Sequence, residues 1–175
     1  MRPAEAPPAA RGQEPARVFL ALLPGSAQRR QLARHVAAWH WPPGASVYAQ
    51  ADWHLTLHFI GAVARTRLPE LSAACAVPMA PFPLDWGRPT LWPQGLAVLR
   101  PLALPPALRD LHAALAGALQ ARRLPTDARP YEPHLTLARR AAGARPPEDV
   151  PAWDWPVRGY ALMESTGRPA ARYRV

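Results

Sequence analysis

The tetrapeptide His-Leu-Thr-Leu occurs twice in this chain of 175 residues, at positions 54–57 and 134–137. In each copy a polar residue alternates with a leucine. On a β-strand this alternation directs the histidine and the threonine to one face and the leucines into the core. Two such strands facing each other would surround one pocket with two imidazoles and two hydroxyls, which suits acid and base catalysis on a phosphate ester. The repeat therefore predicts an enzyme with an internal duplication.

The apolar pattern around the repeat predicts a mixture of strands and helices. Residues 1–16 are rich in proline, alanine and arginine and are expected to form a disordered tail. A single domain is expected over residues 17–175. The expected strands are 17–23, 53–60, 82–88, 95–100, 133–139, 156–164 and 171–175, and the expected helices are 26–39 with Ser26 as N-cap, 67–76 and 106–122.

The basic residues are all arginines, 21 of them against 12 acidic residues, and the formal net charge is +9. Two explanations stay open at this point. An alanine-, arginine- and proline-rich chain without lysine is typical of a GC-rich genome, whereas guanidinium groups also attract polyanions such as RNA. The charge alone does not identify an enzyme acting on RNA.

The single Cys75 excludes an internal disulfide. No apolar run approaches the roughly 20 residues of a membrane-spanning helix. The apolar run 18–23 faintly resembles a secretory signal, but Glu5 and Glu14 lie in the region that would have to be basic. We therefore expect a cytoplasmic protein without a membrane partner.

The chain resembles the two-histidine (2H) phosphoesterase superfamily, and within it the RNA 2′,3′-cyclic phosphodiesterases, also called the 2′-5′ RNA ligase family. The segments that carry the resemblance are 17–22, 54–61, 133–139, 162–165 and 173–175. The resemblance implies an α+β fold that is bilobal, with two antiparallel β-sheets flanked by helices and related by a pseudo-twofold axis. The two motifs would then meet in a central cleft.

The resemblance also implies catalytic roles, with His54 as general acid and His134 as general base in hydrolysis of a 2′,3′-cyclic phosphate. The ribose O3′ would leave, so that a 2′-phosphate remains, and the reverse reaction would join two RNA strands through a 2′-5′ linkage. An imidazole near its ordinary pKa of about 6.5 suits either role. Burial of both histidines as core residues is the alternative reading.

Thr56 and Thr136 follow the histidines by two residues and share their face, so their hydroxyls can bind nonbridging phosphate oxygens. The resemblance brings Arg139 toward phosphate and Phe59 toward the base. Both lie five residues after a histidine, where strict alternation places them on the opposite face. A β-bulge or a strand end is therefore required to turn them inward.

The remaining aromatic and titratable residues are expected to serve mainly in packing. His58 continues the alternating set and is expected to reach the rim of the cleft. On a strand, His54 and His58 are too far apart for a zinc pair. Packing or surface positions are expected for His35, His40, His112, Tyr131 and the seven tryptophans, the alternative for the tryptophans being a platform for single-stranded RNA.

The sequence thus predicts a phosphoesterase that needs no metal, ATP or other cofactor. Its partners would be RNA ends or nucleotides carrying a 2′,3′-cyclic phosphate, and we expect a monomer. Ligation through an adenylylated lysine is excluded because the chain has no lysine. Two alternatives stay open: a two-histidine phosphodiesterase for another cyclic nucleotide, and an RNA-binding module whose histidines do not turn over substrate.

Overall fold

The computed structural model describes residues 14–148, 153–168 and 171–175. Residues 1–13 of the predicted tail lie outside this range, whereas Ala16 already belongs to the first strand. The described residues form three α-helices and nine strands: β1 Ala16–Leu22, α1 Ser26–Ala37, β2 Ser46–Val47, β3 Leu55–Val63, α2 Leu68–Ala74, β4 Phe82–Trp92, β5 Leu96–Pro101, α3 Pro106–Ala121, β6 Leu135–Arg139, β7 Trp153–Val157, β8 Ala161–Ser165 and β9 Tyr173–Arg174.

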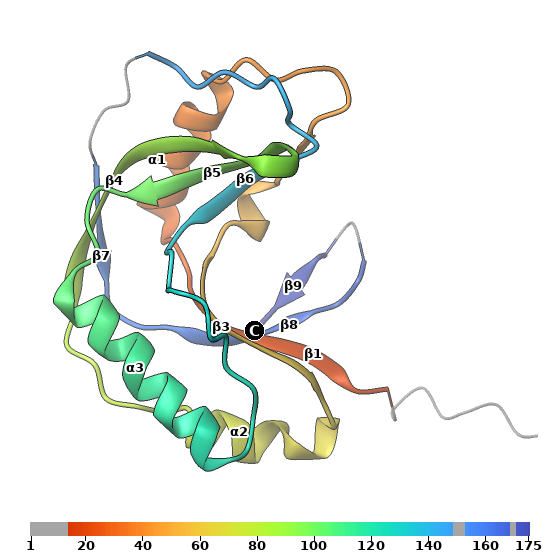
Figure 1. Cartoon of the computed structure of the whole chain (residues 1–175), viewed down its shortest axis with the longest axis vertical. Coiled ribbons are helices and arrows are strands. Elements are labelled where there is room, and N and C mark those ends of the chain that lie inside the picture. The colour runs from red at the N-terminus through yellow and green to blue at the C-terminus, as the bar shows by residue number, and fades with distance from the viewer. Residues whose placement is uncertain (1–13, 149–152, 169–170) are drawn as a thin grey trace, which may run out of the picture.

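These strands form one strongly curled antiparallel sheet in the order β7-β4-β5-β6-β3-β1-β8-β9, with β2 paired to β6. Figure 1 shows the sheet wrapping around a central space that the β8–β9 hairpin borders at one side. The two halves of the order meet where β3 pairs with β6 through Leu55 and Leu135. Beyond that pair the two motif strands diverge, each supported by its own neighbours. The α+β fold with a duplicated, two-lobed arrangement is therefore confirmed, and the two predicted sheets are continuous.

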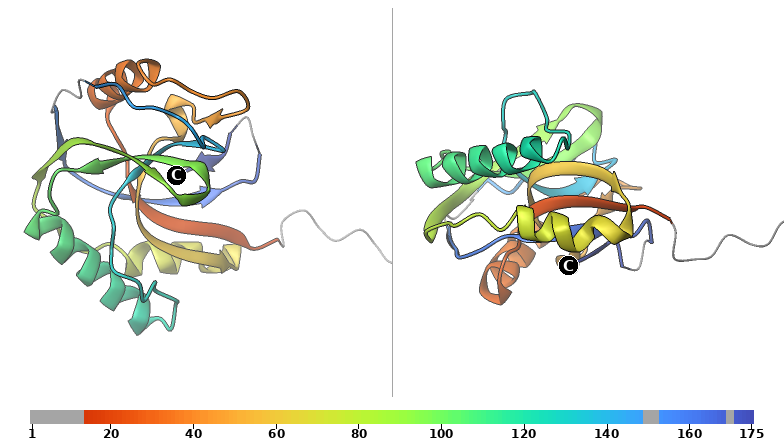
Figure 2. Two further views of the ribbon diagram at one scale, coloured as in Figure 1. Left: turned by 45° about the horizontal axis from the view of Figure 1, so that its top comes forward. Right: turned by 90° about the horizontal axis from the view of Figure 1, so that it is seen from below.

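The helices cover different parts of the sheet. Helix α1 lies behind β4, β5 and β6, whereas α2 and α3 lie beside β3 and β1 (Figures 1 and 2). Helix α3 presents four buried leucines at helical spacing, which are Leu108, Leu111, Leu115 and Leu119. Burying such a side chain stabilises the fold by about 1.5–3 kcal/mol.

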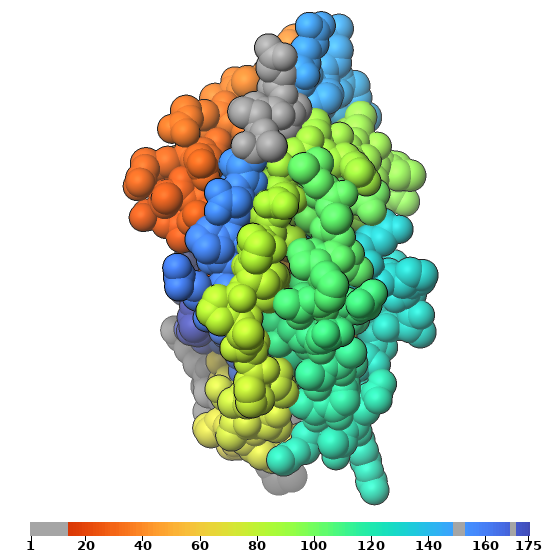
Figure 3. Space-filling model, turned by 90° about the vertical axis from the view of Figure 1, so that its left-hand side faces the viewer, coloured from red at the N-terminus to blue at the C-terminus, as the bar shows by residue number. Residues whose placement is uncertain are grey.

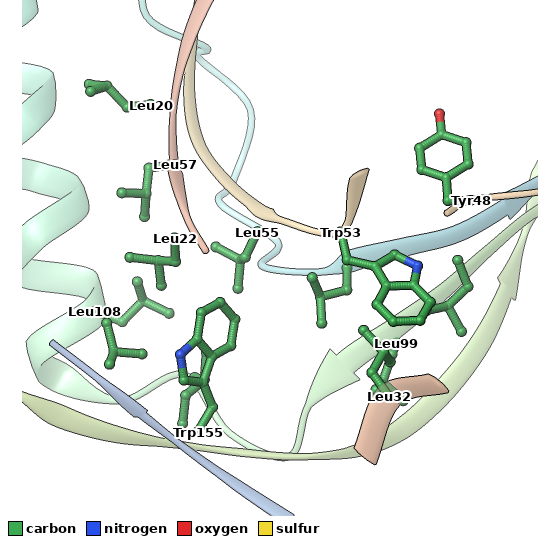
Figure 4. Close-up of a cluster of buried hydrophobic side chains, with 14 of the residues drawn as sticks. Leu20, Leu22, Leu32, Tyr48, Trp53, Leu55, Leu57, Leu99, Leu108 and Trp155 are labelled. Carbon is green, nitrogen blue, oxygen red and sulfur yellow. The ribbon is translucent and has the colours of Figure 1, made fainter. Parts of the chain in front are cut away.

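The apolar core is continuous through both halves. Figure 4 shows Leu20, Leu22 and Leu57 facing α3 with Leu108, and Leu32 of α1 beside Leu99 and Trp53. Leu55 lies between the two groups, close to the junction of the halves. The leucines of the first motif therefore anchor its strand on the core side, as the alternation predicts.

Several predicted boundaries are wrong. The motif strands begin two residues later than expected, at Leu55 and Leu135, and α1 ends at Ala37. The N-cap of α1 is Gly25 rather than Ser26, because the chain enters the helix extended at Gly25 and Ser26 already has helical geometry. The predicted strand 156–164 is two strands, since the chain crosses from β4, the partner of β7, to β1, the partner of β8. The predicted strand 95–100 corresponds to β5. The predicted strand 82–88 is too short, because β4 continues to Trp92.

The face of the molecule seen in Figure 3 is formed largely by α1, β7, β4 and α3, which are coloured orange, blue, yellow-green and green. No helix among the described residues is both long and apolar enough to span a membrane.

Candidate active site

His54 and His134 lie immediately before the residues that join the two halves of the sheet, Leu55 and Leu135. Each histidine therefore precedes its strand rather than belonging to it, because the ladder hydrogen bonds begin one residue later. The pairing of the two leucines brings each histidine level with the threonine of the other motif, and the charge of His134 acts on His54, although the two segments are 80 residues apart in the sequence.

The two imidazoles are oriented by the same local hydrogen bond. His54 Nδ1 lies 2.7 Å from the carbonyl oxygen of Asp52, and His134 Nδ1 lies 2.8 Å from that of Glu132. A carbonyl oxygen only accepts, so Nδ1 carries a proton and donates it in both rings. The proton-transfer atom that remains in each ring is Nε2. The two copies of the motif therefore share the tautomer of their histidine as well as their amino-acid sequence.

The electrostatic surroundings of the two histidines are also similar. Burial lowers the pKa of His54, and the charge of His134 lowers it further, while the hydrogen bond to Asp52 opposes this change. Burial likewise lowers the pKa of His134, with the bond to Glu132 opposing and Arg100 adding to the effect. Without bound anion both rings therefore favour the neutral form near pH 7, and a bound phosphate would favour protonation.

Each motif strand contains a bulge after its threonine. Where β1 pairs with β3, Ala21 lies opposite Thr56 and the next residue, Leu20, lies opposite His58, so that Leu57 is extra. The β5–β6 ladder omits Leu137 in the same way. The burial pattern along the first five residues of both strands is identical, ending in a buried pair and an exposed residue.

The bulge reverses the face of the residues that follow it. Phe59 and Arg139 needed such a bulge, because strict alternation would place them on the face opposite to the histidines. Both side chains are exposed. Phe59 lines a cavity of about 370 Å³ together with Thr56 and His134. Thr136 lies opposite Val98 on the neighbouring strand and does not line this cavity.

His58 does not reach the cleft rim, because the bulge turns it inward. It is 3% exposed, and its Nε2 donates to the carbonyl oxygen of His112 at 2.8 Å. The rings of His58, His112 and Tyr131 form a continuous stack, with centroids 4.0 and 3.9 Å apart. Tyr131 also donates to the carbonyl oxygen of Thr56. This ring stack is compatible with packing roles for His112 and Tyr131, but all three rings also contribute to the lining of the cavity of about 370 Å³. His58 is buried within that lining, so the exposed rim position expected for it was wrong.

Aromatic side chains flank both catalytic candidates, and sequence reasoning did not identify them. Phe19 and Tyr173 lie against His54, with ring centroids 4.9 and 4.7 Å away. Trp92 lies against His134 at 4.5 Å. The packing interpretation is correct for the buried Trp53, Trp86, Trp153 and Trp155, whereas Trp92 packs at the edge of the cavity, against a catalytic candidate. The alternation of β1 could have indicated Phe19, whereas nothing local in the sequence distinguishes Trp92.

Arg139 is held by a residue that the sequence did not single out. Its Nε donates to the hydroxyl of Tyr48 at 2.8 Å, and Tyr48 is 6% exposed. The ring of Tyr48 lies under the guanidinium of Arg172, 4.8 Å away, and Arg172 pairs with Asp52 at 3.4 Å. Burial raises the pKa of Asp52, which Arg172 opposes. This network connects Arg139 to the segment that holds His54.

Within the described residues, no three histidine, cysteine, aspartate or glutamate side chains lie close enough together to hold a metal ion. The groups brought together are two imidazoles with matched tautomers, a hydroxyl, a guanidinium and several aromatic rings. Such a set can transfer protons and bind an anion next to a planar ring.

Comparison with known proteins gives a consistent result. A family model described as "2'-5' RNA ligase superfamily" matches residues 24–167. The chain is 34% identical over 166 residues to the RNA 2′,3′-cyclic phosphodiesterase of Escherichia coli (strain K12), with 87% of this chain and 86% of that protein covered. It is 35% identical over 129 residues to the protein of the same name from Thermus thermophilus. That match covers 66% of this chain and 65% of the Thermus protein, just under two thirds of its length.

Solved structures with the same fold extend over nearly the whole chain. A crystal structure of a phosphoesterase has a TM-score of 0.77 and 28% identity, covering 92% of this chain and 94% of its own. E. coli LigT complexed with ATP has a TM-score of 0.72 and 27% identity, covering 91% and 93%.

Proposed function

The chain belongs to the 2′-5′ RNA ligase superfamily, and on this premise we propose that it hydrolyses 2′,3′-cyclic phosphates on RNA ends or nucleotides to 2′-phosphates. The observation that carries the proposal is the matched pair of Nδ1–carbonyl hydrogen bonds at His54 and His134. Two imidazoles held in the same tautomer can supply one acid and one base from their Nε2 atoms. The names of the E. coli and Thermus relatives support the same substrate.

The proton transfers follow from these two positions. His134 Nε2 takes a proton from water as the water oxygen attacks phosphorus. The bond from phosphorus to O3′ breaks, and protonated His54 gives its Nε2 proton to O3′. The product is a 2′-phosphate with a free 3′-hydroxyl. A 5′-hydroxyl in place of water would instead give a 2′-5′ linkage, so the same groups can catalyse joining.

The substrate contacts proposed here come from the outer parts of both motif strands. Thr56 and Thr136 donate their hydroxyls to nonbridging phosphate oxygens, which gain charge in the transition state. Arg139, fixed through Nε by Tyr48, directs its remaining guanidinium donors to the phosphate. Phe59, 67% exposed at the edge of the cavity, stacks on the base.

The proposal also covers the setting of the reaction. The enzyme acts as a single-domain monomer in the cytoplasm and uses neither metal nor cofactor. The donors around the two histidines support a reaction without metal, because protonated imidazole, hydroxyls and guanidinium can together stabilise the charge of a phosphate without a metal ion.

The test is turnover of the four 2′,3′-cyclic mononucleotides in EDTA. We expect full activity with EDTA present and a product that carries its phosphate on the 2′-hydroxyl. Loss of activity in EDTA that added metal restores would overturn the metal-free mechanism. Turnover of 3′,5′-cyclic nucleotides alone would favour a different cyclic-nucleotide phosphodiesterase, and tight RNA binding without turnover would favour a binding module.

A further inference from the structure

A row of cationic side chains runs across the sheet from His134 toward β4. Leu99 of β5 lies opposite Leu135, so the next residue of β5, Arg100, is level with His134. Arg88 of β4 lies directly opposite Arg100. Because neighbouring strands are about 4.8 Å apart, the backbones of Arg100 and Arg88 lie about one and two strand spacings from the backbone of His134.

A bulge in β4 places Arg88 on the same face of the sheet as Arg100. Trp86 lies opposite Pro101 and Arg88 lies opposite Arg100, so that Gly87 is extra in β4. Trp86 is fully buried in the core, and Arg88 beyond the bulge is exposed. The bulge therefore reverses the face of β4, as the bulges in the motif strands do.

Trp92 connects this row to the catalytic candidate. Its ring lies 4.5 Å from the ring of His134, and the guanidinium of Arg100 lies 6.0 Å from the centre of the same indole. The guanidinium of Arg100 can therefore be no farther from the imidazole of His134 than the sum of these two lengths.

A second hollow opens at the two arginines. Its volume is about 220 Å³, and Arg88, Arg100, Leu102, Leu104 and Tyr131 contribute to its lining. Tyr131 lines the larger cavity at His134 as well, so the two spaces share a wall. Leu102 and Leu104 are 44% and 38% exposed. The hollow therefore offers an apolar wall beside two positive charges.

The charges in this hollow are only partly neutralised. Arg100 faces Glu132 at 4.0 Å across an exposed gap. Arg88 donates to the carbonyl oxygen of Leu102 at 3.3 Å, and none of the described carboxylates lies within 4.0 Å of it. Two like charges opposite each other on a sheet repel, and an anion between them relieves the repulsion.

Among the described strands, the register position equivalent to Arg100 in the other half of the sheet is apolar. Leu22 of β1 lies opposite Leu55, so the residue level with His54 is Leu23. The apolar Leu23 is therefore level with His54, whereas the charged Arg100 is level with His134. This asymmetry gives the site a direction along which a polyanion can extend.

We propose that Arg88 and Arg100 bind a second RNA phosphate, one nucleotide away from the reacting phosphate, while the leucines contact the attached nucleoside. This inference rests on the proposed function and specifies its substrate as an RNA strand rather than a mononucleotide. The phosphate belongs either to the strand that carries the cyclic end or to the strand whose 5′-hydroxyl attacks in joining.

The experiment compares kcat/KM for a 2′,3′-cyclic mononucleotide and for a dinucleotide that ends in the same cyclic nucleotide. Arg88→Gln removes the charge at the farther position, and Arg88→Lys keeps it. Arg109→Gln is the matched control, since it removes one charge from the exposed side of α3. Joining of two short strands through a 2′-5′ linkage is measured with the same variants.

We expect Arg88→Gln to lower the dinucleotide-to-mononucleotide ratio roughly tenfold, Arg88→Lys to recover most of it, and Arg109→Gln to leave it unchanged. The slope of log kcat/KM against log salt for the dinucleotide should fall by about 0.7 in Arg88→Gln. If the phosphate belongs to the attacking strand, the loss appears only in joining. Unchanged ratios and unchanged joining overturn the inference, whereas absence of turnover with every substrate overturns the proposed function itself.

Discussion

The two catalytic candidates share a tautomer as well as a sequence motif, because each Nδ1 donates to the carbonyl two residues earlier. We predict that His54→Ala and His134→Ala each lower kcat by roughly 10²- to 10⁴-fold, the usual contribution of a positioned acid or base. The double variant should be little worse than the worse single variant, since the two groups act in one step. Steady-state kinetics on a cyclic mononucleotide measures both effects. Full activity in either single variant would contradict the assignment.

The lowered pKa values predict the position of the pH optimum. The acid must be protonated and the base neutral, so kcat/KM should be bell-shaped. Burial lowers the pKa of both His54 and His134, so the alkaline limb should begin below about pH 6.5. A bound phosphate favours the protonated ring, and the alkaline limb of kcat should therefore lie at higher pH than that of kcat/KM. A profile that rises steadily from pH 5 to 9 would contradict this mechanism.

Arg139 and Phe59 occupy equivalent positions but should affect substrates differently. Arg139→Ala should weaken turnover of all four cyclic mononucleotides by a similar factor, because the guanidinium contacts a phosphate that they share. Phe59→Ala should cost about 1–3 kcal/mol and should affect purines more than pyrimidines, because stacking depends on the size of the base. Kinetics with four substrates and two variants measures this. A loss that depends on the base for Arg139→Ala would show that the arginine contacts the base instead.

The strands themselves were only partly predictable. The alternation of the motif identifies β3 and β6 and their buried leucines, since a period of two is visible in a single segment. The sequence indicated that a bulge or strand end was needed in each motif strand, but not that the bulges lie at Leu57 and Leu137. The position of a bulge depends on the register with the neighbouring strand, β1 or β5. Neither site carries a glycine that would indicate it. His58 was therefore assigned to the wrong face.

The same limitation explains the missing aromatic residues. Trp92 belongs to the site because β4 continues to it and pairs there with Leu96, whereas local sequence predicted an end near residue 88. Tyr173 reaches His54 from β9, which is the far edge of the sheet order. Contacts between elements distant in sequence cannot be inferred from the pattern within either element. The repeat was informative because it marked two distant elements in the same way.

The hairpin that carries Trp92 depends on one glycine. Gly95 has φ +71°, and a Cβ there would lie 2.6 Å from the backbone nitrogen of Ala142. We predict that Gly95→Ala destabilises the protein by about 2 kcal/mol or more, because backbone strain and a backbone clash act together. It should also lower kcat by displacing Trp92 from His134. Gly143→Ala is the control, because Gly143 has φ +86° but no atom within 4 Å of the added Cβ, and it should cost about 1 kcal/mol. Urea denaturation of both variants measures the difference, and equal losses would contradict the clash.

The whole molecule contains several histidines whose neutral form is favoured by folding. Burial lowers the pKa of His35, His54 and His134, and it lowers that of His112 to about 4. In the unfolded chain these groups take up protons near pH 6.5. The unfolded state therefore binds more protons than the folded state between about pH 6.5 and 4, and stability must fall as pH falls through this range. Asp52 acts in the opposite direction, because burial raises its pKa.

Acid should therefore destabilise the fold well above the pH at which most carboxylates titrate, and His35 provides a specific test. Its Nε2 accepts a hydrogen bond from Trp39 Nε1 at 2.9 Å, and His35 is 7% exposed. Protonation of Nε2 removes this acceptor. In His35→Gln an amide oxygen can take its place without titrating, so the variant should lose less stability than the wild type between pH 7.5 and 5. Each proton bound more by the unfolded state changes the slope by about 1.4 kcal/mol per pH unit. Urea denaturation at several pH values gives both slopes; parallel curves for variant and wild type would show that His35 does not contribute to the acid sensitivity of the fold.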